Sequence, residues 1–119
     1  MKRKKISRAE RQLVYDKTNG RCAYCGSKIS LSDFQIDHLS PFVHGGKCVL
    51  ENLYAACRSC NHRKGTSDIE SFRKQIEAFP SVLQRDNVTY RNAVRFGVVT
   101  PTPHKVKFYF EKMEVQDGI

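Results

Sequence analysis

The chain has 119 residues, of which 39% are hydrophobic, and it carries a formal net charge of +9. This length fits one domain with a modest core, and no apolar run is long enough to span a bilayer. The N-terminal end is basic but no apolar segment follows it, so we expect a cytoplasmic protein without a secretory signal. The strong positive charge favours an anionic partner, most commonly nucleic acid.

Residues 1–11 contain six basic residues and one acidic residue. Two interpretations of this segment stay open: a solvated, flexible tail over residues 1–6, or an arm that holds phosphates. A helix is expected next, in SRAERQLVYDKTNG, because Ser7 and Glu10 form a capping box and Gly20 provides a stop.

Short strands and turns are expected in the middle of the chain. Phe34 and Ile36 alternate with polar residues, as in a strand with one buried face. Pro41 and the pair Gly45 and Gly46 mark a loop. The expected elements are a cysteine turn at 21–26, a strand at 31–39, a loop at 40–52, a strand at 52–57 and a second cysteine turn at 57–65 that opens a brief helix.

The last third of the chain is expected to be helical up to a final strand. Ile69, Phe72 and Ile76 recur at helical spacing, and Pro80 is expected to end that helix. Val106 and Phe108 belong to an alternating pattern that predicts a strand. The expected elements are helices at 66–79 and 85–97, a rigid spacer at 100–103 and a strand at 104–113.

Four of the five cysteines form two C-x-x-C pairs that are separated by 31 residues. Two intervening residues allow both thiolates of a pair to reach one ion, and four thiolates complete a closed, structural zinc site. The alternatives are a redox dithiol or buried thiols, and two pairs in one short chain favour zinc. The expected ligands are Cys22, Cys25, Cys57 and Cys60.

The fifth cysteine, Cys48, stands alone in the central loop. A catalytic cysteine needs an activating neighbour, and the nearest candidate is His44. We therefore expect Cys48 to be a small, half-buried residue and His44 to be an ordinary loop residue.

Several polar residues lie between or directly after the cysteine pairs. Asp37 and His38 are adjacent, Asn52 follows later, and Asn61 comes directly after Cys60. Taken singly, such residues are usually turn residues, helix caps or surface side chains. Their order and spacing, DH-x2-P-x3-GG-x5-N-L-x3-C-x2-C-N-x2-K-G, closely resemble the HNH endonuclease family, also called ββα-metal or His-Me finger nucleases.

The resemblance covers about residues 20–66 and implies an α+β fold, in which two antiparallel strands near 33–38 and 52–56 are followed by a helix that begins near Asn61. We expect one domain over 1–119, with this zinc-stapled core, flanking helices over 67–119 and a terminal strand. Adjacent strand residues face opposite sides. The strand must therefore end or bulge at Asp37 and His38 if both are to serve one site.

The resemblance also implies roles for these residues. His38 would be the general base that activates water, with Asn52 holding the imidazole. Asp37 and Asn61 would supply oxygen ligands to a catalytic Mg²⁺ or Mn²⁺. Many relatives have histidine at the position of Asn61, and the neighbouring His62 is the alternative ligand.

Basic residues near the expected helix start complete the set of candidates. By position they would contact phosphates, and a solvated basic face is an equal alternative. These residues are Arg58, Arg63 and Lys64.

The function we expect is metal-dependent hydrolysis of phosphodiester bonds in double-stranded DNA, in the cytoplasm of a bacterial or phage-infected cell. One alternative is a zinc-ribbon module that binds DNA without catalysis, which would need only the cysteines and the positive charge. Another is an accessory nuclease of a phage terminase or a similar DNA-processing complex. RNA is also open as a substrate.

Overall fold

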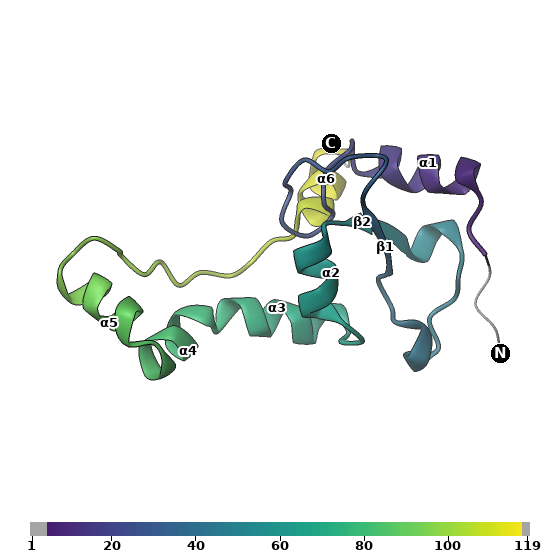
Figure 1. Cartoon of the computed structure of the whole chain (residues 1–119). Coiled ribbons are helices and arrows are strands. Elements are labelled where there is room, and N and C mark those ends of the chain that lie inside the picture. The colour runs from purple at the N-terminus through teal and green to yellow at the C-terminus, as the bar shows by residue number, and fades with distance from the viewer. Residues whose placement is uncertain (1–4, 118–119) are drawn as a thin grey trace. The chain divides into compact units, whose positions relative to one another are not determined.

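The computed structural model describes residues 5–117 and divides the chain into two compact units (Figure 1). The first unit runs to Ile69 and resumes at Lys107, and the second is Glu70–Val106. Within the tail expected at 1–6, residues 1–4 lie outside the described part, and Ile6 packs against the core. The expectation of one domain over 1–119 stays a prediction.

The first unit begins with helix α1 (Arg8–Lys17), which has the expected capping box. The Glu10 backbone amide donates to the Ser7 hydroxyl, and the Ser7 amide donates to the Glu10 carboxylate, both at 3.1 Å. These bonds satisfy two amides that have no partner inside the helix. Val14 is completely buried, so α1 is fixed both by its cap and by its inner face.

A two-stranded antiparallel sheet follows, made of β1 (Gln35–His38) and β2 (Leu53–Ala56). Asp37 lies opposite Tyr54 in the register, and His38 lies opposite Leu53. Helix α1 packs on β2, and helix α2 (Arg58–Lys64) packs on β1. The core consists of Val14, Phe34, Leu53 and Ala55. The expected α+β class, with two short strands followed by a helix, is confirmed.

The loop between the strands contains two short 3₁₀ helices, η1 (Phe42–His44) and η2 (Leu50–Asn52). Gly45 ends η1 with φ of +89°, a left-handed conformation that favours glycine. A Cβ atom added to Gly46 would lie 1.8 Å from the carbonyl oxygen of Ser40. The glycine pair therefore allows the loop to fold back on the residues that leave β1.

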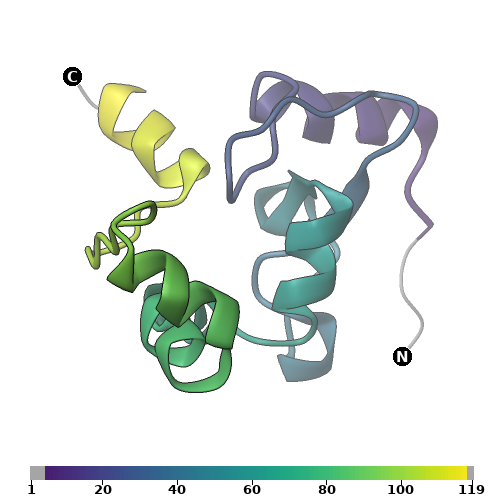
Figure 2. The same ribbon diagram turned by 60° about the vertical axis from the view of Figure 1, so that its left-hand side comes forward.

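The second unit contains most of α3 (Ile69–Glu77) together with α4 (Phe79–Asp86) and α5 (Val88–Arg95). Helices α4 and α5 pack on each other, as Figure 2 shows. We did not expect α4, because Pro80 reads as a helix stop. Pro80 instead occupies the first turn of α4, where its missing N–H costs no hydrogen bond. None of the helices in residues 5–117 combines the length and apolar character needed to cross a bilayer.

The strand expected at 104–113 is wrong. Residues 101–108 have no regular structure, and helix α6 (Tyr109–Asp117) follows them. The Phe108 amide donates to the Glu111 carboxylate at 2.8 Å, which caps the start of this helix. Phe108 and Phe110 are both buried against the ring of Tyr24. Their alternation therefore reflects anchoring onto an aromatic cluster, without a strand partner.

We expect Gly46→Ala to destabilise the protein by about 3 kcal/mol, because the new methyl group would overlap backbone that has little freedom to move. Gly45→Ala is the matched control, since nothing lies within 4 Å of its Cβ position. That variant should cost only about 1–2 kcal/mol, from its left-handed backbone. Urea denaturation of both variants measures the difference, and equal losses would show that the close approach of Gly46 to Ser40 is not a constraint.

Candidate active site and metal centre

The four cysteines of the two C-x-x-C pairs form one cluster in the first unit. Cys22 and Cys25 lie in the turn that precedes β1, Cys57 is the N-cap of α2, and Cys60 lies in the first turn of that helix. Their sulfur atoms all lie within 4.8 Å of one another, and those of Cys25 and Cys57 are 3.9 Å apart. The cluster therefore joins the chain before the sheet to the helix after it.

This cluster fits a zinc ion. Zn–S bonds of about 2.3 Å in a tetrahedron place sulfurs about 3.8 Å apart, close to the spacing here. A hydrogen bond from Cys60 lowers the pKa of Cys22 to about 4, against the opposing effect of burial. The same bond raises the pKa of Cys60, and burial raises that of Cys57. The cluster thus favours the thiolate form at Cys22, which is the form that binds a cation.

Cys48 takes no part in the cluster. It is half-buried and packs against the core around Val14 and Leu53. The expectation that Cys48 is a small, partly buried residue is confirmed.

A second candidate site is a cavity of about 200 Å³ between β1, the loop and α2. Asp37 and His38 reach it from β1, and Asn61 reaches it from α2. The strand is regular up to His38 and ends there, where the Leu39 amide donates to the carbonyl oxygen of Asn52 at 2.9 Å. Of the expected end or bulge, the bulge is absent: Asp37 and His38 are both paired within the regular strand, which ends directly after them.

Two donors hold the same carboxylate oxygen of Asp37. The Tyr24 hydroxyl donates to Oδ2, and the ammonium of Lys64 lies 3.0 Å from Oδ2. Burial and the charge of Asp37 raise the pKa of Tyr24, so this hydroxyl remains a proton donor. Tyr24 was not a candidate from the sequence, because no spacing rule connects the middle of a cysteine turn with a strand residue 13 positions away.

Lys64 differs from its expected place on the surface. Only 1% of it is exposed, and its ammonium also donates to the carbonyl oxygen of His38 at 3.1 Å. A buried ammonium needs a charged partner, and Asp37 is that partner. In this structure Lys64 therefore lies in the interior beside the candidate site, and its predicted contact with phosphate stays a prediction.

Asn52 fastens the loop. Its side-chain oxygen accepts from the Ser40 amide at 2.8 Å, and its side-chain nitrogen donates to the carbonyl oxygens of Ser40 and Lys47. We expected Asn52 to hold the imidazole of His38. Its hydrogen bonds instead join the two ends of the loop between β1 and β2. In this loop the ring of Phe42 lies 6.2 Å from the imidazole of His38.

The remaining candidates lie around α2. Asn61 lines the cavity, whereas the exposed His62 does not, and this favours Asn61 over His62 as a ligand. Arg58 and Arg63 are exposed. Arg58 forms a surface ion pair with Asp33 at 3.3 Å, and such pairs contribute little to stability, so both arginines are accessible to a charged ligand.

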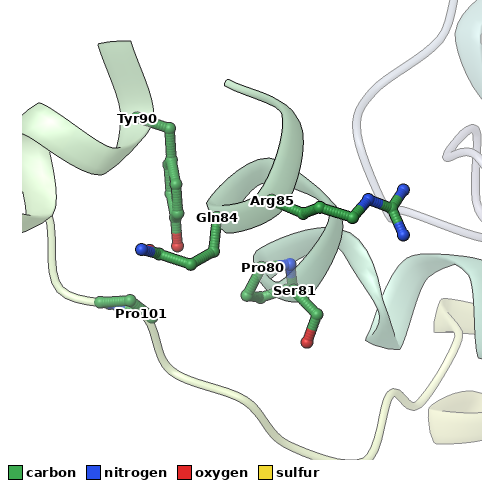
Figure 3. Close-up of a pocket in the computed structure, with 6 residues that line it drawn as sticks. All are labelled: Pro80, Ser81, Gln84, Arg85, Tyr90 and Pro101. Carbon is green, nitrogen blue, oxygen red and sulfur yellow. The ribbon is translucent and has the colours of Figure 1, made fainter. Parts of the chain in front are cut away.

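A larger cavity, of about 400 Å³, lies in the second unit (Figure 3). In this view the hydroxyl of Tyr90 and the amide of Gln84 lie close together, whereas Arg85 points away from them. The lining residues are Pro80, Ser81, Gln84, Arg85, Tyr90 and Pro101. This set has no carboxylate, imidazole or thiol, so it lacks the groups that activate water or hold a hard cation.

Comparison with known proteins finds a family model that matches the segment containing the cysteine cluster and the cavity of Asp37, His38 and Asn61. Residues 22–67 match the model of the HNH endonuclease family, and this range contains every candidate residue described above. The CRISPR-associated endonuclease Cas9 of Corynebacterium diphtheriae is 38% identical over 73 residues, which make up 59% of this chain and 7% of that protein. The chain therefore spans only a small part of this relative.

A solved structure agrees with this match. The Type II-C Cas9 enzyme from Actinomyces naeslundii superposes with a TM-score of 0.53 and 28% sequence identity. The similarity covers 63% of this chain and 8% of that enzyme. The shared fold thus covers part of this chain and a small part of a much longer one.

We expect one zinc ion per chain, and its removal should unfold the first unit because the cluster joins segments far apart in sequence. A strong chelator or Cys60→Ser should lower the melting temperature by more than about 10 °C, which corresponds to a loss of several kcal/mol. Cys48→Ser is the control and should retain the zinc. Metal analysis with thermal melting tests this, and a zinc-free protein that melts like the wild type would contradict it.

Proposed function

Residues 22–67 form an HNH endonuclease domain, and from this premise we propose that the protein is a metal-dependent endonuclease that hydrolyses phosphodiester bonds in duplex DNA. The observation that supports the proposal best is that Asp37, His38 and Asn61 line the same cavity. Hydrolysis needs a base for water and stabilisation of the charged phosphate, and these three side chains offer the groups for both.

His38 is the proposed general base. A neutral imidazole takes a proton from a water molecule, the water oxygen attacks phosphorus, and the bond to the 3′ oxygen breaks. The end of β1 at His38 and the loop fastened by Asn52 would keep the imidazole facing the cavity. Asn52 is thus a positioning residue in this proposal, acting through the loop backbone.

Asp37 and Asn61 are the residues that would hold a catalytic Mg²⁺ or Mn²⁺. A carboxylate and an amide oxygen are donors that such hard cations accept, and water and phosphate oxygens complete their shell. When bound, the ion acts as a Lewis acid on the phosphate. The donor set fits, because the bonds described for Asp37 both end on Oδ2, so that Oδ1 remains for a cation.

DNA binding would rest mainly on phosphate contacts. The net charge of +9 provides long-range attraction, and the exposed Arg58 and Arg63 lie on the helix that also carries Asn61. A domain of this size has room for few contacts with base edges. We therefore propose cleavage with little sequence preference and with strong dependence on salt concentration.

The wild type should nick or cut supercoiled plasmid in Mg²⁺ or Mn²⁺, and His38→Ala should lower the rate by at least about 100-fold, the usual contribution of a general base. The exposed His44 is the matched control, and His44→Ala should retain activity within about threefold. If wild type and His38→Ala leave plasmid equally intact in several metals while both still bind DNA, the non-catalytic zinc-ribbon alternative holds instead.

Cleavage should also depend on pH. An imidazole can accept a proton only when it is neutral, and free imidazole loses its proton near pH 6.5. The single-turnover rate should therefore rise between about pH 6 and pH 8 and then level off. A rate that stays flat over this range, with zinc content constant, would count against His38 as the base.

A further inference from the structure

We propose that Lys64 is a built-in counter-charge to Asp37, which keeps the divalent-cation site weak until a DNA phosphate binds. The inference rests on the proposed function and concerns how its metal site is regulated. It starts from an ion pair inside the cavity wall: the ammonium of Lys64 lies 3.0 Å from Oδ2 of Asp37.

The ion pair is held in place from several sides. The side chain of Lys64 has no exposure, and its ammonium also donates to the His38 carbonyl oxygen at 3.1 Å. Lys64 follows Asn61 by three positions on α2, so both side chains lie on the helix face toward β1. A buried ammonium cannot exchange its partner for water at low cost, and the positive charge therefore stays beside the carboxylate.

With Tyr24, the two oxygens of the Asp37 carboxylate have different surroundings. The Tyr24 hydroxyl donates to Oδ2, the oxygen that Lys64 also contacts. Within the described residues, both contacts of this carboxylate end on Oδ2, so Oδ1 is the oxygen that would take a cation. The positive charge thus lies beside the same carboxylate group but contacts its other oxygen. It lowers the attraction for the cation without blocking its place.

A charge count shows the consequence. Among the described residues that line the cavity, Asp37 is the one carboxylate, and Lys64 balances its charge. The affinity of an oxygen site for a hard divalent cation rises with the number of negatively charged ligands, so a site whose carboxylate is neutralised should bind the cation weakly. A bound phosphate would supply the missing negative charge, and linkage requires that the cation then strengthen phosphate binding equally.

Direct Mn²⁺ binding, measured by electron paramagnetic resonance on the zinc-loaded protein without DNA, tests the proposal. Lys64→Gln removes the charge but keeps a donor near both acceptors, and it should bind Mn²⁺ at least about tenfold more tightly than the wild type. Lys64→Met should do the same. Unchanged or weaker Mn²⁺ binding by the folded variants would overturn the proposal.

Tyr24→Phe is the matched control, because it removes a neutral donor from the same oxygen and keeps the ring that packs on Phe108. It should change Mn²⁺ affinity by less than about threefold. An equal gain in Tyr24→Phe and Lys64→Gln would mean that freeing the carboxylate, and not the charge, sets the affinity, and this result would also overturn the proposal.

A measurement with the native lysine covers the case in which the Lys64 variants fail to fold. In His38→Ala protein, in which cleavage should be slow compared with the binding measurement, added duplex DNA should tighten Mn²⁺ binding by about tenfold or more. If added duplex DNA leaves the Mn²⁺ affinity unchanged, the proposal is overturned. Because the readout is metal binding, these results separate the two inferences. A protein that cleaves DNA, but whose Mn²⁺ affinity does not respond to DNA, refutes only the counter-charge role of Lys64. A protein whose Mn²⁺ affinity rises with DNA, but which does not cleave DNA, refutes only the nuclease proposal.

Discussion

The four-cysteine cluster is the constraint on which the rest of the first unit depends. It joins the turn before β1 to the first turn of α2, although 31 residues separate the two pairs. The turn is also bound to β2, through the bond from the Ala23 amide to the Ala55 carbonyl oxygen, and to α6, through the bond from the Phe110 amide to Ala23. Zinc at this cluster would therefore fix Tyr24 at one end of the cavity and the start of α2 at the other.

The segments that the cysteine cluster joins also supply the polar groups in and around the cavity. Tyr24 and Lys64 reach Asp37 from the two segments that the cysteines join, and Asn61 comes from the same helix as Lys64. Breaking a buried ion pair by removing one partner typically costs about 3–5 kcal/mol. Loss of either Asp37 or Lys64 should therefore weaken the packing of α2 on β1, and the pair also sets the charge that a cation or a phosphate would meet.

The sequence predicted the parts of this structure that depend on local chemistry or on fixed spacing. The capping box of Ser7 and Glu10, the cysteine cluster and the approach of Asp37, His38 and Asn61 follow from motifs. The partners of Asp37 did not, because Tyr24 and Lys64 meet it only through tertiary packing. The terminal strand was wrong for a similar reason: Phe108 and Phe110 alternate because they pack on the aromatic ring of Tyr24, and Glu111 caps a helix there.

A crystal structure of the protein with Mn²⁺ and a short duplex, with anomalous maps for both metals, tests the central claim most directly. We predict a zinc signal at the centre of the four sulfurs and a manganese signal about 2.1 Å from the side-chain oxygens of Asp37 and Asn61. The imidazole of His38 should face the phosphate beside the manganese. A manganese signal held by His62, or a phosphate bound away from this cavity, would contradict the account.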